Sequence, residues 1–216
     1  MIDWAGWGTS VGTLVLAGAT FFAIRSANRA ARIAERSLLA GLRPLLVVAR
    51  RDDPPEEILF ADGQTFETGR GRALLHCQDD VIYLAIPLRN AGTGIAQLQG
   101  YRLEAEPAGR VRADPLGPAR HRRGDQPPDL ASFAEQQRDL YVAPGDTGFW
   151  QAALRDPASP RHAAAVQAIT TGGRLTVDLL YGDLEGGQLT VTRLVCLPST
   201  ARSWRCDVAR HWRVRA

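Results

Sequence analysis

The feature that most constrains this chain is an uncharged run close to its N-terminus. From Trp4 to Ile24 there are 21 consecutive residues without an acidic or basic side chain. As a helix, a run of that length covers roughly 30 Å, the thickness of the hydrocarbon core of a bilayer. Trp4 and Trp7 lie at its outer end, where indole rings favour the lipid headgroups. The run predicts a transmembrane helix within residues 1–24, with the lipid bilayer as a partner.

A buried core helix and a cleaved signal peptide are the alternatives for this run. Asp3 lies where a signal peptide would carry positive charge. Residues 25–43 are rich in Arg, Ala and Leu, which predicts a basic juxtamembrane helix that ends before Pro44. The positive-inside rule then predicts a single-pass protein of the inner or plasma membrane, with its N-terminus outside and its remaining domain in the cytoplasm. Three reduced cysteines would suit that compartment.

Two glycines in the uncharged run are spaced four residues apart. Gly8 and Gly12 form a GxxxG pair, a spacing that lets two helices approach closely. The pair is a candidate face for self-association. The alternative is that glycine is simply common in membrane helices.

From residue 44 onward the sequence has the periodicity of strands. Short apolar runs are separated by turns rich in Gly, Asn, Asp and Pro, which is typical of an antiparallel sheet. Glycines of the turn 90–94 are expected at positive φ. The domain at 44–216 is therefore predicted to be mainly β, an antiparallel sandwich. The predicted strands are 45–49, 57–60, 81–89, 95–106, 139–142, 149–154, 175–181 and 188–197.

Two segments interrupt this pattern. Residues 160–170 predict one short inserted helix, with a proline near its start. Residues 107–137 carry five prolines and five arginines and predict a long insertion. A short helix is expected at the end of that insertion, over residues 130–138.

Three stretches carry a resemblance to a known class of domain: LRNAGTGIAQLQGYRLE, VAPGDTGFW and LLYGDLEGGQLTVTR. They resemble the turn sequences of bacterial single-span membrane proteins with an Ig-like or fibronectin-like β-sandwich. The resemblance covers residues 44–198. It implies an Ig-like domain behind a single span, and it implies no catalytic residue.

The remaining composition and motifs narrow the function. A net charge of +3 is too small to indicate a nucleic-acid partner. The sequence contains no GxSxG, Walker A, HExxH or dinucleotide-binding motif, and its cysteines and histidines lack the close-spaced pairs typical of zinc sites. These observations favour a membrane-anchored, non-enzymatic protein-interaction module without metal or cofactor. The alternative is a membrane-tethered enzyme or ligand-sensing domain, with a site formed by the 107–137 insertion and the 160–170 helix.

Two groups of residues are candidates for binding a protein partner. Arg120, Arg122 and Arg123 form a basic tract in the insertion. Trp204 and Trp212 bracket an arginine-bearing segment at the C-terminus, and Trp and Arg are enriched among residues that dominate binding energy at interfaces. The alternatives are that the tract is a solvated loop and that both indoles pack against the sandwich.

Overall fold

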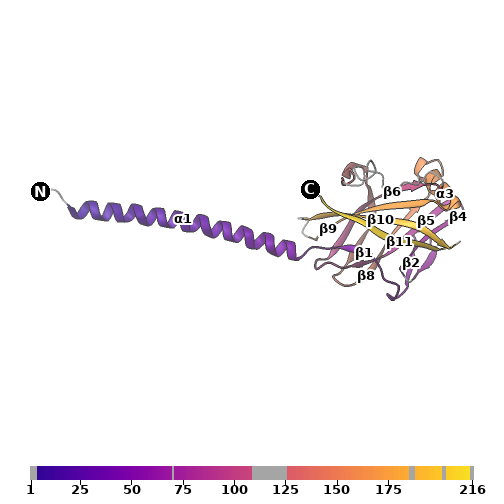
Figure 1. Cartoon of the computed structure of the whole chain (residues 1–216), viewed down its shortest axis with the longest axis horizontal. Coiled ribbons are helices and arrows are strands. Elements are labelled where there is room, and N and C mark those ends of the chain that lie inside the picture. The colour runs from indigo at the N-terminus through magenta and orange to yellow at the C-terminus, as the bar shows by residue number, and fades with distance from the viewer. Residues whose placement is uncertain (1–3, 70, 109–125, 185–187, 201–202, 215–216) are drawn as a thin grey trace. The chain divides into compact units, whose positions relative to one another are not determined.

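The computed structural model describes residues 4–69, 71–108, 126–184, 188–200 and 203–214. The chain divides into two compact units after Gly41. The first unit contains one long helix and the second contains all the strands of the described residues (Figure 1). A mainly β protein with an antiparallel sheet is what the sequence predicted.

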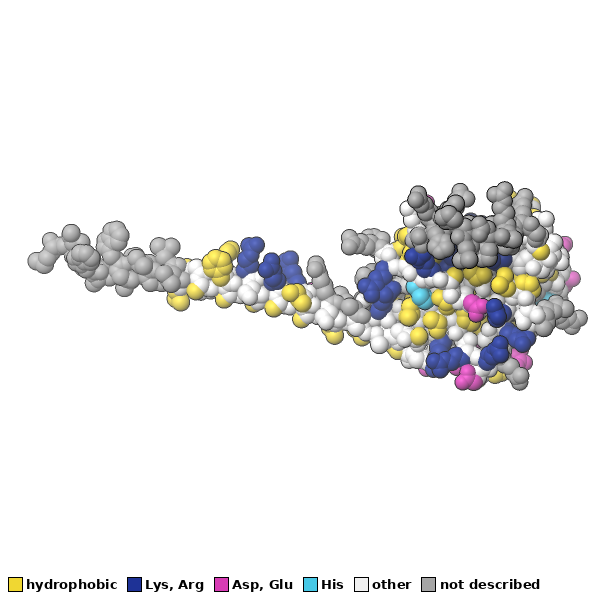
Figure 2. All heavy atoms as spheres, viewed as in Figure 1, with side chains coloured by type: hydrophobic (Ala, Val, Ile, Leu, Met, Phe, Trp, Pro, Cys, Tyr) yellow, Lys and Arg dark blue, Asp and Glu magenta, His cyan; other side chains and the backbone are white. Residues whose placement is uncertain are grey.

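Helix α1 runs without a break from Trp4 to Gly41. The predicted transmembrane and juxtamembrane helices are therefore one helix. The transmembrane prediction itself is not supported, because in the part of the chain that the structure describes no helix is both long and apolar enough to cross a membrane. Side chains of α1 are described from Leu16 onward, apart from those at positions 36, 39 and 40, and the nine residues from Leu16 to Ile24 are the uncharged ones before Arg25. Arginine side chains then follow along the helix (Figure 2).

Among the described residues, nine strands form one curled antiparallel sheet in the order β1-β5-β4-β11-β10-β9-β6-β7, with β8 paired to β5. Strands β2 and β3 form a separate hairpin. The strands are β1 Leu46–Val48, β2 Glu56–Leu59, β3 Thr65–Thr68, β4 Arg72–Gln78, β5 Val81–Asn90, β6 Ala96–Glu106, β7 Ala134–Val142, β8 Thr147–Leu154, β9 Arg174–Gly182, β10 Leu189–Thr200 and β11 Ser203–Val214.

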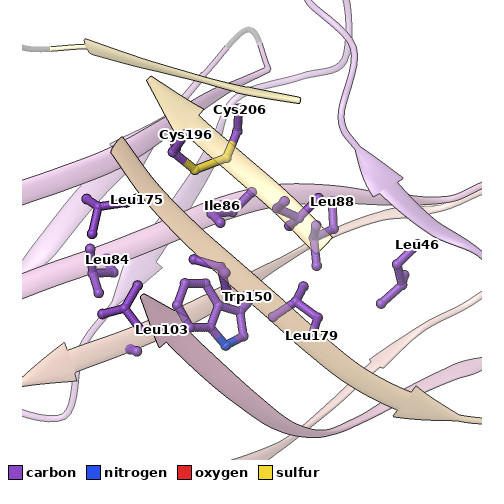
Figure 3. Close-up of a cluster of buried hydrophobic side chains, with 14 of the residues drawn as sticks. Leu46, Leu84, Ile86, Leu88, Leu103, Trp150, Leu175, Leu179, Cys196 and Cys206 are labelled. Atoms are coloured by element: carbon purple, nitrogen blue, oxygen red, sulfur yellow. A yellow bond between two sulfur atoms is a disulfide. The ribbon is translucent and has the colours of Figure 1, made fainter. Parts of the chain in front are cut away.

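The curled sheet has two halves that enclose the main core. Strands β1, β4, β5 and β8 form one half, and β6, β7, β9, β10 and β11 form the other. The halves are joined where Trp204 pairs with Ala73 and Arg205 pairs with Arg72. Large apolar side chains from both halves meet between them, with Trp150 near the centre (Figure 3). This arrangement is compatible with the predicted sandwich.

Strand β5 is buried on both of its faces. Its alternating apolar residues, from Ile82 to Leu88, point into the main core, as their period of two predicts. Tyr83 and Ala85 point to the opposite face, where Ile58 and Phe60 of the β2–β3 hairpin cover them. The hairpin thus forms a second, smaller core on the outside of the sheet.

The predicted inserted helix is confirmed as α3, Pro160–Thr171. The Ser159 side chain accepts a hydrogen bond from the Arg161 amide at its start, and Gly172 ends it in the left-handed conformation at φ 68°. Ala165 and Ala168 are fully buried against the core. Their small side chains let the helix lie close to the sheet.

The prediction of a second short helix at residues 130–138 is wrong. Only a single 3-10 turn, η1 Leu130–Ser132, forms there, with the Asp129 carboxylate accepting a hydrogen bond from the Ala131 amide. Phe133 is already extended, and β7 begins at Ala134 and pairs with β6. Tertiary pairing therefore overrides the helical propensity of this segment.

Glycines of the turn 90–94 are needed for a reason other than the expected positive φ. Neither Gly92 nor Gly94 is among the described glycines with positive φ. Instead the chain entering the domain passes directly over them: a Cβ at Gly94 would overlap the Leu42 carbonyl oxygen. Thr93 also donates its amide to the Arg43 carbonyl at 3.0 Å. The turn therefore holds the first residues of the domain in place.

Gly94→Ala should lower the stability of the domain by about 1–3 kcal/mol, because the added methyl group forces the Leu42 backbone away from the turn. Thermal unfolding of the full chain should show a melting temperature lower by roughly 2–4 °C per kcal/mol lost. Gly69→Ala is the matched control, because its Cβ would meet Pro55 at an ordinary 3.5 Å. Equal melting temperatures for the two variants would contradict this role of Gly94.

Candidate interaction surface

The predicted binding residues fall in three different settings. Arg120, Arg122 and Arg123 lie outside the described residues. Trp204 is only 4% exposed and belongs to the main core, which is the packing alternative left open by the sequence. Trp212 is 8% exposed and lies on the outer face of β11, opposite Val191 of β10. The two indoles therefore lie on opposite faces of β11.

Trp212 is held under an arginine network on the outer face of β6, β9 and β10. The Arg193 guanidinium lies 5.0 Å from the centre of the Trp212 ring, within reach of a cation–π interaction. The same guanidinium donates to both carboxylate oxygens of Asp178, at 2.7 and 2.8 Å. Those hydrogen bonds raise the pKa of Arg193. Asp178 is 1% exposed, so this ion pair fixes neighbouring strands together.

Arg102 of β6 completes this network. Its guanidinium lies 3.5 Å from Asp178 and also contacts Glu104 on the same strand. A buried carboxylate between two arginines is costly to disrupt, because removing one partner leaves an uncompensated charge. The network therefore has a structural role, because its carboxylates and guanidinium groups are paired with one another.

Two of the three cysteines are paired in the structure. Cys196 of β10 and Cys206 of β11 are directly opposite each other and form a disulfide (Figure 3). Both are buried beside the joint between the halves of the sheet. Three reduced cysteines would have suited a cytoplasmic domain, and the structure instead pairs two of them. Disulfides are typical of oxidising compartments and are rare in the cytosol.

A buried chain of hydrogen bonds attaches β1 to the C-terminal strands. The Leu46 amide donates to the Tyr181 hydroxyl at 3.1 Å, and that hydroxyl lies 2.8 Å from Thr192 Oγ1. Thr192 Oγ1 in turn lies 2.7 Å from His211 Nδ1. Burial lowers the pKa of His211, and the nearby positive charge of Arg43 lowers it further. The neutral imidazole is thus the form that the folded domain favours.

A groove forms where β7 and β8 separate. The two strands are joined by the tight turn 143–146, in which Gly145 has φ 81°. They then part, since β7 pairs with β6 and β8 pairs with β5. In the pairings of the described residues, each of the two has a neighbour on one side only. The separating edges and the β2–β3 hairpin line a cavity of about 570 Å³.

Two buried polar atoms of residues that line this groove lack partners among the described residues. Gln136 Oε1 of β7 and Gln151 Oε1 of β8 are buried and accept no hydrogen bond from any described residue. A buried polar atom left in this way costs roughly 1–3 kcal/mol. Sequence reasoning missed both glutamines, because each is an ordinary polar residue of a strand until the separation of the strands is known.

The far wall of the groove is held by an ion pair. The Asp62 carboxylate, in the β2–β3 turn, accepts from the Tyr83 hydroxyl at 2.6 Å and from the Arg155 guanidinium at 2.7 Å. The hydrogen bond from Tyr83, followed by the one from Arg155, lowers the pKa of the Asp62 carboxyl to about 2. The carboxylate is therefore charged at neutral pH, and the hairpin is fixed against the end of β8.

Comparison with known proteins adds no relative to these observations. No known protein family, curated protein or solved structure matches this chain. In the residues that the structure describes, no three His, Cys, Asp or Glu side chains are grouped closely enough to hold a metal ion. The groove between β7 and β8 is the surface that the geometry singles out.

Acidification should destabilise the domain through His211. Its folded-state pKa is lowered, so the unfolded chain binds the proton more readily, and stability should fall as the pH drops below about 6.5. Above that value both states are neutral and this loss disappears. Urea unfolding of the full chain between pH 5 and 8 measures the effect.

His211→Gln should flatten this part of the pH profile, because glutamine stays uncharged while its amide can still bond to Thr192. His76→Gln is the control, since His76 is exposed. A profile that His211→Gln leaves unchanged would contradict the assignment.

The redox state of Cys196 and Cys206 in the cell should report the compartment of the domain. We expect the pair to be oxidised, because the two residues are buried directly opposite each other. When cells are lysed under denaturing conditions in the presence of a thiol-alkylating reagent, Cys77 alone should therefore react. Such a result would reverse the predicted cytoplasmic orientation. Alkylation of all three cysteines without prior reduction would instead support that orientation.

Proposed function

We propose that this chain is a non-enzymatic protein-interaction module tethered to a membrane by α1. The observation that carries the interaction is the groove between β7 and β8, where the edges of two strands that pair on one side only line the same space. Exposed strand edges are templates for pairing with another chain. A partner in the groove would lie against strand edges that no described strand covers.

The rigidity of the groove supports this proposal. Its walls are set by the Asp62 ion pair and by the continuous register of β8 along β5. A preformed surface loses less conformational entropy on binding than one that must be ordered first. Leu59, at the edge of the groove, is 56% exposed and offers an apolar contact to a partner.

The tether rests on the sequence of α1. The uncharged run from Trp4 to Ile24 has the length of a membrane span, and Phe21 and Phe22 are exposed on the helix. Arginines that follow the run can contact anionic headgroups. Self-association through Gly8 and Gly12 belongs to the same proposal, and the side chains of that part of α1 lie outside the described set.

An Ig-like identity for the domain is also part of this proposal. The turn 90–94 and the Pro144-Gly145 turn support it, as does an antiparallel sheet folded around one core. The strand order of the curled sheet can be compared directly with the strand order of Ig-like domains, and this comparison tests the identity.

Site-specific photocrosslinking in cells tests the module. A photoreactive amino acid at Leu59 of the full chain should give a covalent adduct with another protein, recovered from the membrane fraction. The same residue at Leu184 is the matched control, because Leu184 is also 56% exposed and does not line the groove. Fragment 42–216 should give the adduct from the soluble fraction.

Each component of the proposal can fail separately in this experiment. No adduct from either position would overturn the interaction role, and an adduct from Leu184 alone would place binding elsewhere. Full-length protein recovered only from the soluble fraction would overturn the membrane tether.

A further inference from the structure

Three basic side chains gather at one end of strand β10, where the chain enters the β domain. Thr190 and Thr192 of β10 are two residues apart and therefore lie on one face of the strand. Thr190 pairs with Arg213 of β11, and Thr192 pairs with His211. Paired residues project to the same side of a sheet, with their Cβ atoms about 5 Å apart. The register of the two strands thus brings Arg213 and His211 onto the face of the threonines.

The third basic side chain comes from the segment that leads into the domain. Arg43 follows the last residue of α1 by two positions. Its guanidinium lies 3.5 Å from Thr190 Oγ1, while His211 Nδ1 lies 2.7 Å from Thr192 Oγ1. Arg43 and Arg213 therefore share one threonine as a neighbour, with His211 beside them.

The charges of these side chains act on one another. Burial lowers the pKa of Arg43, and the positive charge of Arg213 lowers it further, while Tyr181 raises it. Burial also lowers the pKa of His211, and the charge of Arg43 adds to that effect. Like charges held close together disfavour their charged forms. An anion bound between the side chains would remove this repulsion.

The lack of an acidic partner distinguishes this cluster from the structural ion pairs of the domain. Every other partly buried arginine among the described residues pairs with a carboxylate: Arg89 with Asp53, Arg102 and Arg193 with Asp178, and Arg174 with Glu106. No described carboxylate forms an ion pair with Arg43, His211 or Arg213. The fold therefore supplies positive charge here without supplying its counter-charge.

We propose that Arg43, Arg213 and His211 form a binding site for a phosphate group. Guanidinium groups donate paired hydrogen bonds to phosphate oxygens, and a protonated imidazole adds a further donor. Arg213 is exposed and the other two are partly exposed, so an anion can reach them from solvent. A phosphate group occurs both on soluble compounds and on lipid headgroups. This site goes beyond the protein interaction proposed above, and none of its residues lines the groove between β7 and β8.

Thermal unfolding of the full chain with inorganic phosphate tests the site, with chloride at equal ionic strength as the reference. Phosphate at about 100 times its dissociation constant should raise the melting temperature by roughly 5–10 °C. Arg213→Gln should bind phosphate at least about tenfold more weakly, because a charge-assisted contact is lost. Without phosphate this variant should be as stable as the unchanged chain or more stable, since it removes a like charge that acts on Arg43.

Arg205→Gln is the matched control for the loss of an arginine. Arg205 lies on the same strand, is exposed, and pairs with Asp207. Phosphate also stabilises folded proteins in general, because it is excluded from their surface, and that contribution is the same in both variants. The difference between Arg213→Gln and Arg205→Gln therefore measures the site alone.

The third member of the site is tested through the pH dependence of sulfate binding. Sulfate has the tetrahedral shape of phosphate and keeps its charge between about pH 5 and about pH 8, the range in which histidine titrates. Sulfate should bind more tightly as the pH falls toward the lowered pKa of His211, because the imidazolium is a third cation. The titratable groups that face His211 are Arg43 and, through Thr192, Tyr181, whose pKa is raised by burial. His211→Gln should remove the pH dependence.

Reconstitution into vesicles distinguishes the two sources of the phosphate group. Phosphatidic acid added to phosphatidylcholine vesicles should stabilise the domain, and Arg213→Gln should lose this effect, if the ligand is a lipid headgroup. The same pattern with inorganic phosphate alone would indicate a soluble ligand.

Two results would overturn the proposal. One is equal stabilisation of the unchanged chain, Arg213→Gln and the second variant Arg43→Gln by phosphate and by phosphatidic acid. The other is a sulfate affinity that His211→Gln leaves unchanged at every pH. Both measurements are independent of the Leu59 adduct, so the protein interaction and the phosphate site can fail separately.

Discussion

Burial of β5 on both faces is the constraint on which the β domain depends. One face carries the side chains around which both halves of the curled sheet close, and the other is covered by the β2–β3 hairpin. The same strand pairs with β1, β4 and β8, so it sets the register of an entire half. Displacing β5 by one residue would exchange its two buried faces, which is why its pairing is strongly specified.

The position of β8 follows from that pairing, and the groove follows from β8. Because β8 pairs with β5 while β7 pairs with β6, the two strands do not pair with each other beyond the turn that joins them. Two sheet edges are therefore left facing one another, without the closure that would remove them. The hairpin β2–β3, present to cover β5, becomes the third wall through Asp62, Tyr83 and Arg155. The candidate site is in this sense a consequence of how the core is covered.

The charged residues of the domain mostly serve the fold. Asp178 with Arg193 and Arg102 joins β6, β9 and β10, and Arg193 also covers Trp212. Trp212, which the sequence made a candidate for binding a partner, is thus part of a structural network. Such networks are difficult to distinguish from binding surfaces in a sequence, since arginine and tryptophan are enriched in both.

The sequence by itself determined the features that depend on neighbours along the chain. The period of two in residues 82–88 predicted their burial, the proline at residue 160 indicated the start of α3, and Gly145 indicated a tight turn. Only the tertiary structure decided which strands pair. That pairing in turn decided the disulfide, the replacement of the predicted 130–138 helix by a strand, and the groove. Cys196 could be matched to Cys206 only through the register of β10 and β11, and Gln136 to Gln151 only through the separation of β7 and β8. These are distances between segments that local periodicity does not encode, because they are set by how the whole sheet curls around its core.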